Sequence, residues 1–159
     1  MSPFDTTTSI ASGGTETGPI AEAIRTRSNI FEMTQAAEDA VLRPKEFGAF
    51  PHDFRAALAA RIAAHAGDAN LAAQYANCTS GMADLSNPSH NSAEDHKILI
   101  AFVDKTSNAT KDISADDISL LQSSGVSDAD IVRLCELVAF VAYQVRVAAG
   151  LRLLQGNKA

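Results

Sequence analysis

The sequence has little of what nucleic-acid-binding, disulfide-bonded or membrane-spanning proteins are built from. Lys and Arg number 13 against 19 Asp and Glu, a net charge of −6 that argues against a cationic surface for phosphates. Two cysteines, Cys78 and Cys135, are too few for a disulfide framework. No apolar run approaches the roughly 20 residues of a membrane helix, and residues 1–18 lack the features of a signal peptide. We therefore expect a cytoplasmic protein that binds neither nucleic acid nor membrane.

Length and spacing predict one helical domain. A chain of 159 residues corresponds to a single domain that can bury a core without a metal or a disulfide. Residues 1–18 are rich in Ser, Thr and Gly and predict a flexible N-terminal arm, with residues 19–159 as the single domain. Beyond residue 20 alanine is abundant, apolar residues recur at helical spacing, and alternating β-branched runs are absent. We expect an all-α bundle of about six helices.

Start and stop signals set the expected helix boundaries. Ser-x-x-Asp starts occur at residues 92, 114 and 127, and Gly67 and Gly125 are expected to stop helices in the left-handed conformation. The expected helices cover residues 19–42, 51–66, 69–82, 92–103, 116–124 and 128–155.

The last of these helices is apolar on nearly every side between Leu134 and Ala149. Such a helix is usually buried, and a domain of this size is too small to cover it alone, so a subunit partner is expected. Arg146 lies within this helix, after Tyr143. A buried guanidinium needs a carboxylate partner or a wet cleft, so Arg146 either forms an ion pair at a subunit interface or holds an anion at the mouth of a helical cleft.

The remaining reactive side chains have structural explanations. His65 is expected at a helix C-terminus, where the helix dipole favours it. His90 and His96, near Glu94 and Asp95, are too loosely spaced for a metal site. The sequence contains neither a glycine-rich phosphate-binding loop nor the Gly-x-Ser-x-Gly motif of serine hydrolases. Cys135 fits an apolar stripe, whereas Cys78 has polar neighbours and is kept as a possible reactive thiol. We expect neither a metal nor a cofactor.

Two stretches together resemble the AhpD-like superfamily, which includes alkylhydroperoxidases and carboxymuconolactone decarboxylases. They are residues 55–75 (RAALAARIAAHAGDANLAAQY) and residues 104–151, which include GVSDADI at 125–131 and AFVAYQVRVAAGL at 139–151. The resemblance covers about residues 20–155 and is closest to the peroxidase-related branch. It implies an AhpD-like helical bundle and, because such relatives are commonly homo-oligomers, a dimer, trimer or hexamer.

The resemblance also locates the family's redox motif, a Glu, a Cys-x-x-Cys and a His. By position these residues fall on Ala56, Asp68, Leu71 and Tyr75, so none of the four catalytic types is present, although the preceding arginine is kept as Arg55. A dithiol cycle needs an attacking thiolate and a resolving thiol. The chain is therefore expected to lack that cycle.

Three functions remain open at the level of sequence. The first is a non-redox family member that acts by binding or oligomeric assembly, for which an AhpD-like relative with an intact Cys-x-x-Cys is one candidate partner. The second is a decarboxylase-type enzyme in which Arg146 holds a carboxylate while Asp68, Tyr75 or His65 moves protons. The third is a residual peroxidase that uses Cys78. The candidate cleft comprises His65, Asp68, Tyr75, Tyr143 and Arg146.

Overall fold

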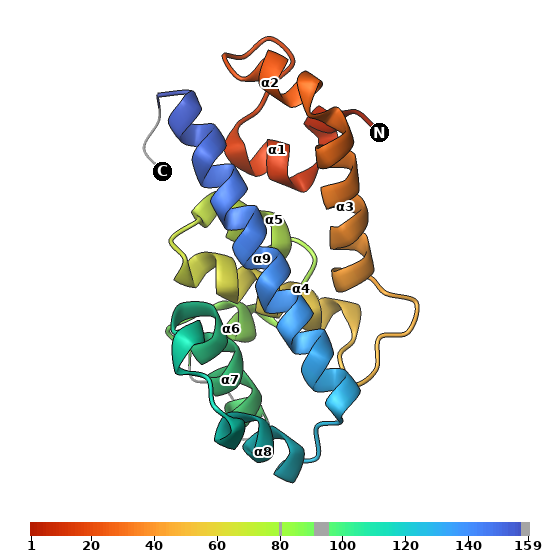
Figure 1. Ribbon diagram of the computed structural model, residues 1–159, viewed down its shortest axis with the longest axis vertical. Helices are drawn as coiled ribbons and strands as arrows, with labels where there is room; N and C mark the ends of the chain where they lie inside the picture. The colour runs from red at the N-terminus through yellow and green to blue at the C-terminus, as the bar shows by residue number, and fades with distance from the viewer. Residues whose placement is uncertain (80, 91–95, 157–159) are drawn as a thin grey trace.

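The computed structural model describes residues 1–79, 81–90 and 96–156, and within these ranges all regular structure is helical (Figure 1). The α-helices are α1 (Thr7–Ser12), α2 (Ala21–Thr26), α3 (Ser28–Leu42), α4 (His52–His65), α5 (Ala69–Ala76), α6 (Ala83–Ser86), α7 (Lys97–Asn108), α8 (Ala115–Ser123) and α9 (Asp128–Leu154), joined by the 3-10 turns η1 (Pro3–Asp5) and η3 (Thr110–Asp112). The all-α prediction is confirmed. The expected number of about six helices is too low, because short helices at the N-terminus and around residue 84 have no clear apolar period.

The long helix α9 organises the fold. It crosses the molecule diagonally, with α3 on one side and α7 and α8 on the other (Figure 1). The side chain of Ser127 caps its first turn by accepting a hydrogen bond from the Asp130 amide at 3.2 Å, and Gly156 follows it with φ of 79°. Both ends match the sequence-based boundaries within a residue. On its inner side α9 packs against α1, α3, α4 and α7.

The helix enclosed on all sides is α4, not α9. Every residue from Phe54 to Ala63 is buried, including five alanines. Small side chains let neighbouring helices approach α4 closely from several directions, so a helix of modest hydrophobicity occupies the centre. Gly67, with φ of 79°, then turns the chain into α5, which packs along α4. The Gly67 and Gly125 stops and the capping box of Ser114 with Asp117 are confirmed.

The outer side of α9 is uncovered, which corrects the expectation of a helix buried all round. Val132, Leu153 and Leu154 expose 55%, 60% and 69% of their surface. By length and composition α9 is also apolar enough to cross a membrane, although only 33% of its most apolar span is buried in the fold. The expectation that no apolar run comes near membrane length is therefore wrong for this helix.

The expected N-terminal arm is the second correction. Residues Pro3–Ser12 form η1 and α1, and the side chains of Thr6, Thr8, Ser9 and Ser12 are buried. Composition indicated mobility because these residues are small and polar. In the structure Thr7 and Thr8 bond to Gln35, Glu38 and Gln144, as the next subsection describes, and Ala11 packs into the core.

Two of the expected helices also have different bounds. The expected helix over residues 19–42 is divided at Arg27 into α2 and α3, and the expected helix over residues 69–82 ends at Ala76. The expected start at Ser92 and Asp95 lies outside the described residues, and α7 is described from Lys97.

Candidate functional site

The four positions that the resemblance aligns with a redox motif, Ala56, Asp68, Leu71 and Tyr75, are occupied by structural side chains. Ala56 and Leu71 are 4% and 0% exposed and belong to the core. Asp68 caps α5, because its carboxylate accepts a hydrogen bond from the Leu71 amide at 3.0 Å. The same carboxylate binds Arg152 of α9, with N–O distances of 2.6 and 3.3 Å. Asp68 is thus fully engaged in holding α5 to α9.

Tyr75, the fourth motif position, ends in a buried polar network. Its hydroxyl donates to the Gln144 side-chain oxygen, and the Gln144 amide nitrogen donates to Glu38 at 2.7 Å and to Thr8 at 3.1 Å. Burial raises the pKa of Tyr75 far above its ordinary value, and the negative charge of Glu38 raises it further. Tyr75 therefore stays protonated and acts as a hydrogen-bond donor, not as a base.

The same network seats the N-terminal helix. Glu38 accepts a hydrogen bond from the Thr7 hydroxyl at 2.8 Å, and the Thr7 amide donates to Gln35 at 2.9 Å. Farther along, Arg152 donates to the Ala11 carbonyl at 3.0 Å. Helix α1 thus packs over Asp68 and Tyr75 of the α5 segment and over the part of α9 that binds them.

His65 belongs to a different cluster. It is the last residue of α4, as predicted, and its Nε2 lies 3.3 Å from an oxygen of Asp104. Asp104 is already bound by the fully buried Arg61, with two N–O distances of 2.7 Å. Because Arg61 also donates to the carbonyls of Asn87 and Pro88, the cluster fixes the loop after α6. The cluster of His65, Arg61 and Asp104 therefore has a structural role, which is to hold α4, α7 and the loop after α6 together.

Arg55, which the resemblance keeps beside the motif, is also structural. It is 2% exposed, and its guanidinium donates to the carbonyls of Phe50, Val41 and Phe47 at 2.8 to 2.9 Å. Burial lowers the pKa of this guanidinium, and the nearby charge of Arg133 lowers it further. Its three carbonyl contacts hold the α3–α4 connection.

Arg146 lines a groove of about 630 Å³ between α9 and the segment of α7, η3 and α8. The groove contains the side chains of Phe102, Thr106, Ser107, Thr110, Ile113, Ile118, Cys135, Val138, Ala139, Ala142 and Arg146. Arg146 is exposed, and its only described hydrogen bond goes to the Ala142 carbonyl at 3.4 Å. Arg146 is therefore not buried within the described chain, and an ion pair across a subunit interface stays a prediction.

The two thiols lie apart from the motif positions. Both are exposed, Cys78 after α5 and Cys135 in the groove, which corrects the core placement expected for Cys135. Partial burial raises the pKa of the Cys135 thiol, and the charge of Glu136 adds to this shift. At neutral pH Cys135 is therefore a weakly ionised thiol rather than an activated nucleophile.

The structure separates the expected cleft residues into different surroundings. Tyr143 is 40% exposed, and its hydroxyl lies 3.0 Å from that of Thr34 on α3. Asp68 and Tyr75 lie beneath α1, His65 lies at Asp104, and Arg146 lines the groove. No single cavity in the described structure joins them.

The other histidines make local contacts. His52 Nε2 is 2.9 Å from the Pro44 carbonyl, His96 packs edge-on against Phe54, and His90 lies 3.8 Å from Asp84. Glu94 and Asp95 are outside the described residues. Within the described ranges no three His, Cys, Asp or Glu side chains are placed to hold a metal ion.

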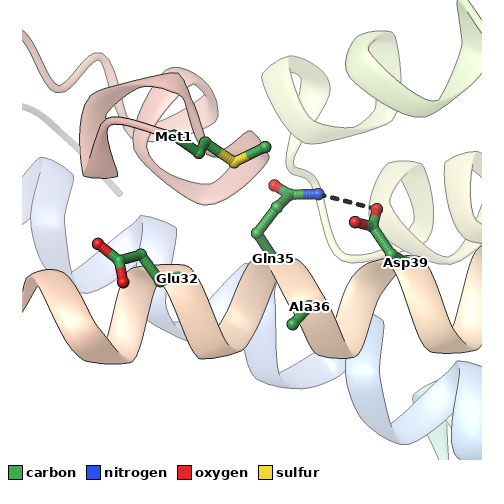
Figure 2. Close-up of a pocket in the computed structure, with 5 residues that line it drawn as sticks. All are labelled: Met1, Glu32, Gln35, Ala36 and Asp39. Carbon is green, nitrogen blue, oxygen red and sulfur yellow. Dashed lines mark hydrogen bonds between the residues drawn. The ribbon is translucent and has the colours of Figure 1, made fainter.

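A second cavity, of about 350 Å³, lies between Met1 and α3 (Figure 2). Its α3 wall consists of Glu32, Gln35, Ala36 and Asp39. The Gln35 side chain is already engaged at both ends, because it donates to Asp39 at 3.4 Å and accepts from the Thr7 amide at 2.9 Å. This wall therefore serves to hold α1.

Sequence reasoning missed Glu38, Arg61 and Gln144. Gln144 carries a usable signal, since it is an amide within an apolar helix, but the charge of Arg146 two residues later is the stronger signal in the same stretch. Gln144 is 0% exposed whereas Arg146 faces solvent, because two residues along a helix turn a side chain to the opposite half of its surface.

Comparison with known proteins supplies no relative: no family model, curated protein or solved structure matches the chain significantly.

Proposed function

We propose that the chain is an AhpD-like protein without redox chemistry, which acts by non-covalent binding and by assembly into a homo-oligomer. The observation that carries this proposal is the use of the motif positions. Asp68 binds Arg152 and the backbone amide of Leu71, and Tyr75 binds Gln144. These side chains therefore support the packing of α1, α5 and α9. No thiol is present there to start a dithiol cycle.

The uncovered outer side of α9 supports the assembly part of the proposal. Large apolar side chains on one exposed helix face are costly to leave in water, and each buried Leu or Val gains about 1.5–3 kcal/mol. Several such contacts offset the entropic cost of association. The partner is another copy of this chain or an AhpD-like relative with an intact Cys-x-x-Cys.

The test combines two measurements on the full-length protein. We expect no consumption of an organic hydroperoxide with a dithiol reductant, and light scattering at micromolar concentration should give a mass that is a multiple of 16.7 kDa. Thiol-dependent turnover that alkylation abolishes would overturn the non-redox part, and Cys78→Ser would show whether Cys78 supplies it. A 16.7 kDa particle would overturn homo-oligomeric assembly.

The groove supports a second candidate, binding or conversion of a small carboxylated molecule. Its wall is mainly apolar, and Arg146 offers a cation without a carboxylate within 4 Å in the described chain. The proton-moving residues once expected beside Arg146 lie elsewhere, so the groove favours binding over acid–base chemistry. Calorimetry with a medium-chain fatty acid, on wild type and on Arg146→Gln, measures this directly.

A further inference from the structure

The outer side of α9 carries six exposed residues at alternating spacings of four and three, hereafter the outer stripe. They are Val132, Glu136, Ala139, Tyr143, Arg146 and Gly150. This spacing places all six along one side of the helix, as in the contact line of a coiled coil. The stripe is about 27 Å long at the rise of an α-helix.

The spacing of the six residues in the outer stripe is symmetric about residue 141. Its members form three pairs that are equidistant from residue 141, namely Val132 with Gly150, Glu136 with Arg146, and Ala139 with Tyr143. When two copies of one helix pack antiparallel about a two-fold axis at residue 141, each member meets its pair in the other copy.

These pairs are complementary in charge. Between Leu134 and Leu151 the only charged residues are Glu136 and Arg146, and both are exposed. In the described structure neither forms an ion pair within 4 Å. The antiparallel arrangement brings them together twice in each dimer, so the two isolated charges of an apolar helix neutralise each other.

The pairs are also complementary in size. Tyr143, the largest member, faces Ala139, and Val132 faces Gly150. The small residues leave room for the larger side chain opposite, which lets the helices approach to the 8–10 Å typical of helix packing. Tyr143 is already held by its contact with Thr34, so its ring needs little further ordering.

We propose that two copies of this chain dimerise through antiparallel α9 helices centred on residue 141, with Glu136 of each copy paired to Arg146 of the other. This inference rests on the assembly described under Proposed function and specifies its geometry. It also completes the groove, since the second copy supplies the carboxylate that Arg146 lacks within the described chain.

A lipid bilayer is the competing occupant of this surface, because α9 has the length and composition of a membrane span. The packing favours a protein partner. The inner side of α9 packs against α1, α3, α4 and α7, so α9 is part of the folded domain, and a stripe with one acidic and one basic residue suits a matching protein surface.

The first test measures self-association by light scattering and sedimentation equilibrium. We expect Arg146→Glu and Glu136→Arg each to weaken it by about tenfold or more, since each places like charges together twice. The double variant Glu136→Arg with Arg146→Glu should return to within about threefold of wild type. Arg27→Glu, an equal charge change at an exposed site outside α9, should leave association unchanged.

The second test reads the register by disulfide trapping in a Cys78→Ser, Cys135→Ser background. Ala139→Cys combined with Tyr143→Cys should give a covalent dimer on mild oxidation. Val132→Cys combined with Tyr143→Cys should not, because those positions are offset by about 10 Å along the paired helices. Circular dichroism confirms that each variant is folded.

The outcomes separate the two proposals. A wild-type monomer overturns both the assembly and this interface, and co-sedimentation of that monomer with phosphatidylcholine vesicles identifies the bilayer as the occupant. An oligomer whose charge-reversed double variant stays weak, or whose 139/143 pair does not cross-link, keeps the assembly and overturns this register. Rescue together with selective cross-linking establishes it.

Discussion

Arg152 of α9 binds both carboxylate oxygens of Asp68, 84 residues earlier in the chain, at 2.6 and 3.3 Å. Asp68 is 4% exposed and also caps α5, so one carboxylate fixes the start of one helix and the end of another. Asp68 is therefore a structural junction between α5 and α9.

Substitutions at Asp68 should separate these two roles. Asp68→Asn can still cap α5 but removes the charge that pairs with Arg152, and we expect a loss of about 3 kcal/mol in the free energy of unfolding. Asp68→Ala should cost about 1 kcal/mol more, because the cap is lost as well. Urea denaturation measures both. Equal stability of the two variants would show that the cap contributes nothing.

Gln144→Leu should be strongly destabilising although it adds apolar surface to the core. It leaves Tyr75, Glu38 and Thr8 without their shared partner in a buried site, at a cost of about 3 kcal/mol. Gln122→Leu is the matched control, because Gln122 is exposed and its side chain bonds to Asp128 at the surface. The control should change the unfolding free energy by less than about 0.5 kcal/mol.

Gly48→Ala should destabilise more than Gly125→Ala. Both glycines have positive φ, 61° and 91°, so both substitutions carry a backbone cost of about 1 kcal/mol. A Cβ at position 48 would also collide with Asp130 and lie 2.7 Å from Arg133, whereas position 125 has open space. Thermal denaturation of the two variants compares them, and equal melting temperatures would contradict the predicted collision.

The stability contributed by Asp130 should depend on pH. Burial acts to raise its carboxyl pKa, but hydrogen bonds from Ser127, the Ala49 amide and Arg133 outweigh burial and lower the pKa below its ordinary value of 3.8. Because the folded pKa is the lower one, the contribution is complete above pH 3.8 and disappears as the pH falls through the folded pKa. Asp130→Asn should therefore destabilise more at pH 7 than at pH 2.5.

Urea titrations of wild type and Asp130→Asn at the two pH values provide the measurement. Asp116→Asn, at an exposed position in α8, controls for the general effect of removing one negative charge. An Asp130→Asn penalty that is the same at both pH values would show that the three hydrogen bonds do not favour the ionised carboxylate.

The elements with strong local signals were predictable from the sequence. Ser127 and Gly156 bracket α9, Ser114 begins α8, and Gly67 separates α4 from α5, because caps and left-handed stops depend on neighbouring residues alone. The all-α class was predictable from the helical spacing of the apolar residues.

The enclosure of each helix was not predictable in this way. Hydrophobicity indicated α9 as the buried helix, yet the alanine-rich α4 is enclosed and α9 is half open. Burial depends on how many neighbours can approach a helix, and small side chains permit more of them. A pattern read along one helix contains no such information.

The candidate site was predicted least well, because its residues act through distant partners. Glu38 and Thr8 meet Gln144 at separations of 106 and 136 residues, and Arg61 meets Asp104 at 43. No local motif marks these pairs. The N-cap at Asp68 is different, because an Asp directly before an apolar helical stripe is a local signal for such a cap.

The seating of α1 has a consequence for how the chain acquires its fold during synthesis. Besides Gln35 and Glu38, the N-terminal helix is held by Gln144, Arg152 and Gln155 at separations of 136 to 143 residues, and these three partners leave the ribosome last. Contacts that close such long loops form late, because the loop entropy is lost before the contact is gained. The first residues to be translated should therefore be among the last to reach their native positions.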